Sequence, residues 1–186
     1  MSFSGESGLR KAGLCGIHPL TQRYIIFKEH MFRHLHMPEQ LAIEFICTFS
    51  RLEYALKSTE FALGNENRVE AWWDKFANTI HEQFIALDEP DLLAATNYIL
   101  TSPPRKQVLE NESLKFVPQQ IDTNQKSTQQ LILMVRTVRN NLFHGGKYCP
   151  NGEMEEGRNE CLVKSSLIVL KACTSLHEQV SISFEL

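Results

Sequence analysis

Apolar residues recur at helical spacing through most of the chain. The first such set is Phe45, Phe49, Leu52 and Leu56. Steps of four, three and four place these side chains on one face of a helix. The pattern predicts a first long helix over residues 38–63, with Pro38 in its first turn and Gly64 after its end.

Four later segments and one earlier stretch show similar patterns. The spacing predicts a second helix over residues 69–87, whose apolar stripe is Trp72, Phe76, Ile80 and Phe84. A shorter helix is expected to follow Pro90 and to end before Pro103. Further helices are predicted over residues 128–143 and 160–178. Residues 23–37 have near-helical spacing and predict a short helix.

The remaining segments have little periodicity, and strand signals are scarce. Residues 103–124 contain three prolines and are expected to form a connecting loop. Residues 180–186 alternate only weakly and are expected to form a tail. The prediction is therefore an all-α fold, an antiparallel bundle of four or five helices. Residues 1–37 would form an N-terminal arm, and residues 38–180 the helical domain.

The helix predicted over residues 128–143 divides into an apolar and a polar face. Its core stripe is Leu131, Val135, Val138 and Leu142. Arg136, Asn140 and His144 lie four apart on nearly the opposite face, and Arg139 lies to one side, roughly 140° from His144.

Leu133 and Phe143 also fall on the outer side of this helix. Large apolar side chains on a polar face indicate that something covers them. We expect the cover to be either another helix of the same chain or a second copy of the protein.

The end of this helix combines side chains suited to phosphodiester chemistry. Arg139 carries a permanent charge and a planar set of donors that matches phosphate. His144 can give or take a proton near neutral pH, and a position at the negative end of a helix favours its protonated form. Gly145 and Gly146 follow, and they allow a ligand to approach the backbone closely.

The segment Arg139-Asn140-x-x-x-His144 resembles the R-N-x-x-x-H signature of the HEPN superfamily (higher eukaryotes and prokaryotes nucleotide-binding domains). Residues 49–57, FSRLEYALK, also resemble the first core helix of a bacterial, often plasmid-borne HEPN subfamily. The resemblance extends over residues 41–176, which is most of the chain.

This resemblance implies a helical bundle that dimerises through the motif helices. It implies a metal-independent endoribonuclease without a cofactor, acting as a toxin or a phage-defence effector, in some cases with an antitoxin protein. By the same resemblance, His144 would transfer the proton, Arg139 would bind the scissile phosphate, and Asn140 would orient one of them. Other HEPN proteins lack activity and bind RNA, a nucleotide or a protein partner instead.

Each of these residues also has a structural interpretation. The structural interpretation of Arg139 and His144 is a helix-capping cluster that pairs with Glu53 or another carboxylate. Arg51 and Glu53 form either a partly buried ion pair or part of the substrate-binding cleft. Arg136 either extends the phosphate site or is an ordinary surface arginine.

Two further sequence features are compatible with ligand binding, but a structural role is favoured for them. His30, His34 and His36 have metal-ligand spacing, but no nearby residue completes a coordination shell. Trp72 and Trp73 are of a residue type that stacks on bases, but Trp72 fits the apolar stripe of the second predicted helix.

Composition and charge limit the classes of partner. The net charge of -3 means that any site for a polyanion must be a local basic patch. No apolar run approaches the roughly 18–20 residues needed to span a bilayer, and the N-terminus is a poor signal peptide. The five cysteines include no C-x-x-C pair, which favours a reducing cytoplasm.

Overall fold

The computed structural model describes residues 18, 20, 21, 23, 35–143, 155 and 157–186. The chain divides into two units, residues 1–33 and residues 34–186. Every helix and strand discussed below belongs to the second unit. The predicted short helix over residues 23–37, and His30 and His34 with it, lies almost entirely outside the described residues.

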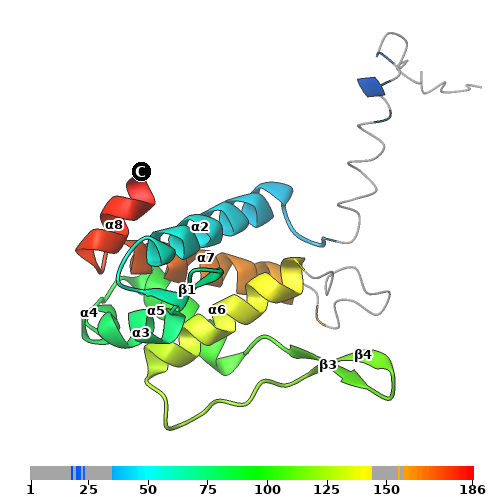
Figure 1. Ribbon diagram of the computed structural model, residues 1–186. Helices are drawn as coiled ribbons and strands as arrows, with labels where there is room; N and C mark the ends of the chain where they lie inside the picture. Colours follow the sequence, from blue (N-terminus) through cyan, green and yellow to red (C-terminus); the bar gives the residue numbers. More distant parts are fainter. Residues whose placement is uncertain (1–17, 19, 22, 24–34, 144–154, 156) are drawn as a thin grey trace, which may run out of the picture. The chain divides into compact units, whose positions relative to one another are not determined.

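The described residues of the second unit form mostly helices, joined by two β-hairpins (Figure 1). The helices are α2 (Glu39–Lys57), α3 (Trp73–Thr79), α4 (His81–Ile85), α5 (Pro90–Thr101), α6 (Ser127–Phe143), α7 (Arg158–Thr174) and α8 (Glu178–Glu185). The strands are β1 (Ala62–Asn65), β2 (Arg68–Ala71), β3 (Lys106–Glu110) and β4 (Ser113–Val117). The prediction of a helical domain is confirmed, but the domain is not purely α-helical.

The helices pack around α7, which contacts α2, α5, α6 and α8. In Figure 1, α7 lies between α2 and α6. The core is built from the predicted stripes: Phe45, Leu52 and Leu56 of α2 and Val135 of α6 are fully buried. Burying such stripes against one another removes apolar surface from water, which is the main stabilising contribution in a bundle.

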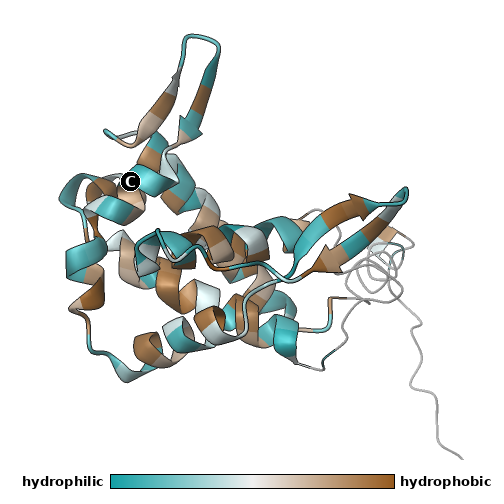
Figure 2. Ribbon diagram, turned by 90° about the horizontal axis from the view of Figure 1, so that it is seen from below, coloured by the Kyte–Doolittle hydropathy of each residue, from teal (hydrophilic) through white to brown (hydrophobic). Residues whose placement is uncertain are grey.

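Both hairpins extend outward from the helical body (Figure 2). Each is antiparallel and two-stranded, pairing β1 with β2 and β3 with β4. The second hairpin replaces the loop predicted over residues 103–124. It turns at Asn111 and Glu112, which both have positive φ, at 50° and 60°. This is the combination that a tight type I′ hairpin turn requires.

The first predicted helix ends earlier than the position of Gly64 suggested. α2 stops at Lys57, where the hydroxyl groups of Ser58 and Thr59 donate to the carbonyls of Tyr54 and Leu56. Gly64 instead lies in β1, with a φ of 153°. A Cβ atom there would lie 2.0 Å from the carbonyl oxygen of Arg68. Glycine is therefore needed for the hairpin and not for a helix end.

The second predicted helix is wrong over its first four residues and is divided in two. Residues 68–71 form β2, and Ile80 separates α3 from α4. Trp72 precedes α3, so helical spacing does not apply to it, and it is 43% exposed. Trp73 is the buried tryptophan, 5% exposed, and it packs on Phe49 with ring centroids 5.1 Å apart.

The last three predicted helices correspond to α5, α6 and α7. The prediction of a C-terminal tail is wrong. Residues 178–185 form α8, whose Val180 is fully buried against the domain. Among the described residues, no helix has the length and apolar character that crossing a membrane requires.

Candidate functional site

The motif residues lie at the C-terminal end of α6, and the core stripe of this helix fixes their direction. Leu131, Val135, Val138 and Leu142 are all buried, as predicted. Because this face is held against the domain, Arg136 and Asn140 are directed away from it. His144 follows the last residue of α6 and lies outside the described residues.

Arg139 is held by contacts on several sides. Its guanidinium carbon lies 5.1 Å from the ring centroids of both Phe49 and Phe143. Nη1 donates to Oδ1 of Asn140 at 2.9 Å, and Nη2 lies 3.7 Å from Oε2 of Glu53. Cation–π contacts of this kind attract the guanidinium to a fixed position while leaving its edge available to a ligand.

The Arg139 side chain is only partly satisfied. It retains 30% of its exposure, and its Nε is buried without a hydrogen-bond partner. A buried donor without a partner costs free energy, which an arriving acceptor would recover. The side chain is therefore partly accessible to a ligand, although the unpaired Nε itself is buried.

Arg139 lines an open pocket of about 320 Å³ between α2, β2, α3 and α6. The other lining residues are Phe49, Glu53, Val69, Glu70, Ala71, Trp73, Arg136 and Asn140. The pocket thus brings together four of the predicted site residues: Arg136, Arg139, Asn140 and Glu53.

The pocket contains two arginines and two glutamates, but each glutamate also has a cation outside the lining. Glu53 accepts from Lys57 at 3.0 Å, a shorter contact than its 3.7 Å to Arg139. Glu70 pairs with Arg68 on the same strand. Arg136 forms no ion pair with the part of the chain that the structure describes. The charges of the lining itself cancel, and cations are in excess only when Lys57 and Arg68, which lie outside the lining, are counted with it.

Arg51 lies apart from this pocket. Its Nε donates to the carbonyl oxygen of Phe184 in α8 at 3.0 Å, and its guanidinium carbon lies 5.7 Å from the Phe184 ring centroid. Arg51 and Glu53 do not pair with each other. Arg51 therefore ties α8 to α2, and of the two only Glu53 reaches the pocket.

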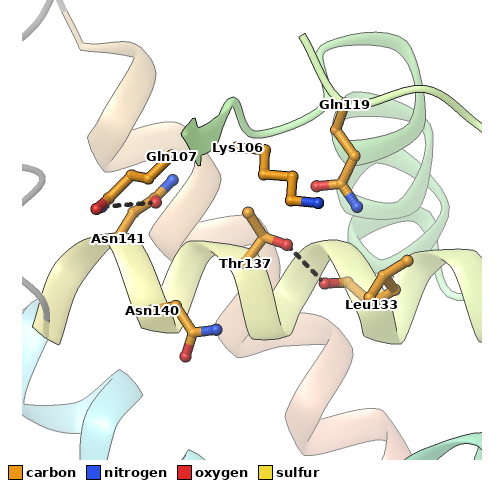
Figure 3. A pocket seen from close by; sticks show the side chains of 7 residues that line it. All are labelled: Lys106, Gln107, Gln119, Leu133, Thr137, Asn140 and Asn141. Atoms are coloured by element: carbon orange, nitrogen blue, oxygen red, sulfur yellow. Dashed lines mark hydrogen bonds between the residues drawn. The ribbon is translucent and has the colours of Figure 1, made fainter. Parts of the chain in front are cut away.

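Asn141, which the sequence did not single out, is the buried asparagine of the motif. It is 5% exposed, donates to the carbonyl oxygen of Arg105 at 2.9 Å, and accepts from Gln107 at 3.1 Å (Figure 3). Its spacing of three from Val138 places it at the edge of the core stripe, a signal that would have identified it.

The contacts of Arg139 with the rings of Phe49 and Phe143 were also not predicted. Phe49 was assigned to the core stripe, and nothing in the sequence indicated that its ring also contacts a guanidinium. Among the described residues, no group of three or more histidine, cysteine, aspartate or glutamate side chains is placed to hold a metal ion.

Comparison with known proteins adds no relative to this description. No protein-family model matches the chain, and neither a curated protein nor a solved structure shows significant similarity to it.

Proposed function

We propose that this protein is a metal-independent endoribonuclease of HEPN type, which cleaves RNA through attack by a 2′-hydroxyl group. The observation that carries this proposal is the pocket shared by Arg136, Arg139 and Asn140, directly before His144 in the sequence. It offers two guanidinium groups at one open surface, with an imidazole following five residues after Arg139. This reaction requires phosphate binding and proton transfer.

In the proposed reaction, the 2′-oxygen of one ribose attacks the adjacent phosphorus and the bond to the 5′-oxygen breaks. His144 takes the proton of the 2′-hydroxyl or protonates the leaving 5′-oxygen. The products are a 2′,3′-cyclic phosphate, which water can open to a 3′-phosphate, and a free 5′-hydroxyl. Because DNA has no 2′-hydroxyl, it should not be cleaved.

The other pocket residues receive supporting roles. Arg139 binds the scissile phosphate and stabilises the charge that develops on it. Asn140, which accepts from Arg139 at 2.9 Å, orients that guanidinium. Glu53 is a positioning residue on the opposite side, and Arg136 holds a neighbouring phosphate.

The test is cleavage of a single-stranded RNA in EDTA by the wild type and by His144→Ala and Arg139→Ala. We expect both substitutions to lower cleavage by at least a hundredfold. Lys164→Ala, which removes an exposed cation from α7, serves as the control and should retain full activity. Melting curves should show that all three variants fold. Equal cleavage by wild type and His144→Ala, or none by wild type, would show that the catalytic proposal is wrong.

The contact between Arg139 and Glu53 favours one alternative, a non-catalytic HEPN module that binds RNA, a nucleotide or a protein partner. A carboxylate beside the arginine opposes the approach of phosphate, and the chain is acidic overall. This alternative predicts that RNA binding survives His144→Ala, is lost in Arg139→Ala, and yields no product.

A homodimer is part of the proposal, because it would bring two copies of the motif together. The support is Phe143, which is 48% exposed at the end of α6. An antitoxin partner, a role in phage defence and a cytoplasmic location rest on the sequence alone.

A further inference from the structure

A second pocket, of about 470 Å³, shares Asn140 with the first. Figure 3 shows the residues that line this second pocket. It lies between the outer face of α6, the start of β3 and the segment after β4. Its lining residues are Lys106, Gln107, Gln119, Leu133, Thr137, Asn140 and Asn141. Asn140 belongs to the lining of both pockets, so the two pockets are neighbours on α6.

The lining combines four side-chain amides with one cation and one apolar surface. Side-chain amides offer a donor and an acceptor side by side, the arrangement that matches the edge of a nucleobase. Leu133, 38% exposed, provides an apolar surface for the flat face of a base. Covering Leu133 in this way would also account for an apolar side chain on the polar side of α6.

Part of this lining is fixed in place before any ligand binds. Asn141 donates to the carbonyl oxygen of Arg105 and accepts from Gln107, which sets the direction of both amides. The Thr137 hydroxyl donates to the carbonyl oxygen of Leu133 at 3.0 Å, so its oxygen remains an acceptor toward the pocket. Side chains fixed in this way lose little entropy when they bind a ligand.

Gln119 is the member of the lining with an unused group. Its Oε1 is buried and has no hydrogen-bond partner. A buried acceptor of this kind is satisfied by an N–H donor, and the exocyclic amines of adenine and cytosine are such donors. Uracil has a carbonyl oxygen at the corresponding position and would place two acceptors against each other.

Lys106 adds a charge at the rim of the pocket. The side chain is exposed and forms no ion pair with any residue that the structure describes. Its ammonium group is therefore available to a phosphate on the nucleotide whose base lies below it.

We propose that this pocket binds an adenine or a cytosine of the RNA substrate, whose amine at C6 or C4 donates to Gln119, next to the phosphate bound by Arg139. The proposal rests on the proposed ribonuclease function and adds a base preference to it. Gln119 determines the preference, Leu133 supports the face of the base, and Lys106 contacts the adjoining phosphate.

The test measures the affinity of His144→Ala, in EDTA, for short oligomers of A, C and U by fluorescence anisotropy. We expect the A and C oligomers to bind about tenfold more tightly than the U oligomer, a difference of about 1.4 kcal/mol. Gln119→Leu should abolish this preference, whereas Gln119→Glu, which keeps acceptor oxygens, should retain the order. Gln120→Leu, which changes an exposed neighbour outside the lining, should leave the preference unchanged.

Equal affinity for the three oligomers, tighter binding of U, or a preference that survives Gln119→Leu would overturn the proposal. Binding of AMP and UMP to the full chain separates this proposal from the ribonuclease function. AMP binding that depends on Gln119, without RNA cleavage, would retain the base pocket and exclude the nuclease. RNA cleavage that is indifferent to the base and to Gln119 would retain the nuclease and exclude the pocket.

Discussion

Asn140 and Asn141 are neighbours in the sequence but lie in opposite surroundings. Asn140 is exposed, bonds to Arg139 and lines both pockets, whereas Asn141 is buried and holds the β3 end of a hairpin against α6. A rotation of about 100° per residue is enough to move a side chain from the solvent to the core. Asn140 therefore lies where a ligand can reach it, whereas Asn141 mainly holds β3 against α6.

This difference predicts separable effects of two matched substitutions. Asn141→Ala leaves the Arg105 carbonyl and the Gln107 amide without their partner, so we expect it to lower the free energy of unfolding by about 1–3 kcal/mol. Asn140→Ala should change stability by less than about 0.5 kcal/mol and should weaken RNA binding instead. Urea titrations and anisotropy measure the two effects, and a reversed order would contradict the assignment.

Cys173 makes stability depend on pH in the alkaline range. Burial in α7 raises the pKa of its thiol from 9.0 to about 12. The unfolded chain therefore ionises first, and stability present below pH 9 is lost as the pH rises toward 12. The loss is about 1.4 kcal/mol for each pH unit above 9, by linkage.

We expect this loss in the wild type and not in Cys173→Ala. Other groups titrate equally in both proteins, so the difference between their free energies of unfolding isolates the thiol. Urea titrations at pH 8 and pH 10 provide the measurement. A difference that stays constant between these pH values would show that the thiol ionises in the folded state as readily as in the unfolded chain.

At the scale of elements, periodicity located the helices well because burial of one face is what holds each helix in place. The stripes of α2 and α6 were assigned correctly from spacing alone, and Pro90 and Pro103 bounded α5. The hairpins were missed because their strands are short and largely exposed, so no buried face imposes a period of two.

The same holds for the candidate site: what lies on one helix could be predicted, and what the tertiary fold brings together could not. That Arg136, Arg139 and Asn140 lie near one another could be predicted, because α6 is regular and these residues are close in the sequence. The surroundings of Arg139 could not be predicted, since β2 and Trp73 reach the pocket only through the tertiary fold. Likewise, nothing in the sequence directs Arg51 to α8 and Glu53 to α6, although the two residues are only two positions apart.

Gly64 links the first hairpin to this site. Gly64 pairs with Val69 of β2, and Val69, Glu70 and Ala71 of that strand line the Arg139 pocket. Gly64→Ala would place a methyl group against the backbone of Arg68 at a φ that side chains rarely adopt. We expect a loss of about 1–3 kcal/mol of stability and weaker RNA binding, because β2 must shift.

Thermal melts and anisotropy measure these two effects. Leu63→Ala is the matched control, because Leu63 is 45% exposed and lies in the same strand. It should cost less than about 0.5 kcal/mol. If Gly64→Ala were as stable as this control, the close approach of β1 and β2 at Gly64 would be refuted.

At the scale of the whole molecule, the proposed function requires an acidic protein to bind RNA. Its net charge of -3 opposes association with a polyanion, so binding depends on a few local cations, Arg136, Arg139 and Lys106. With so few phosphate contacts, affinity should fall only modestly with salt. Pairing two copies of the chain would double the number of these cations at one surface.

Phe143 allows that pairing to be tested. It is 48% exposed beside Arg139, and nothing in the part of the chain that the structure describes covers it fully. In the proposed homodimer a second copy covers this ring, because an exposed aromatic side chain at a helix end gains most from burial against a partner.

We therefore expect the wild type to sediment as a dimer and Phe143→Ser to sediment as a monomer with reduced RNA cleavage. Leu109→Ser is the control. Leu109 is 78% exposed and lies in β3, in the second hairpin, so its replacement should leave the mass of the dimer unchanged. Sedimentation equilibrium over a range of concentrations gives the mass directly. A wild type that is monomeric at every concentration, yet cleaves RNA, would show that one copy of Arg139 and His144 suffices. Phe143 would then act only by contacting Arg139 of its own chain.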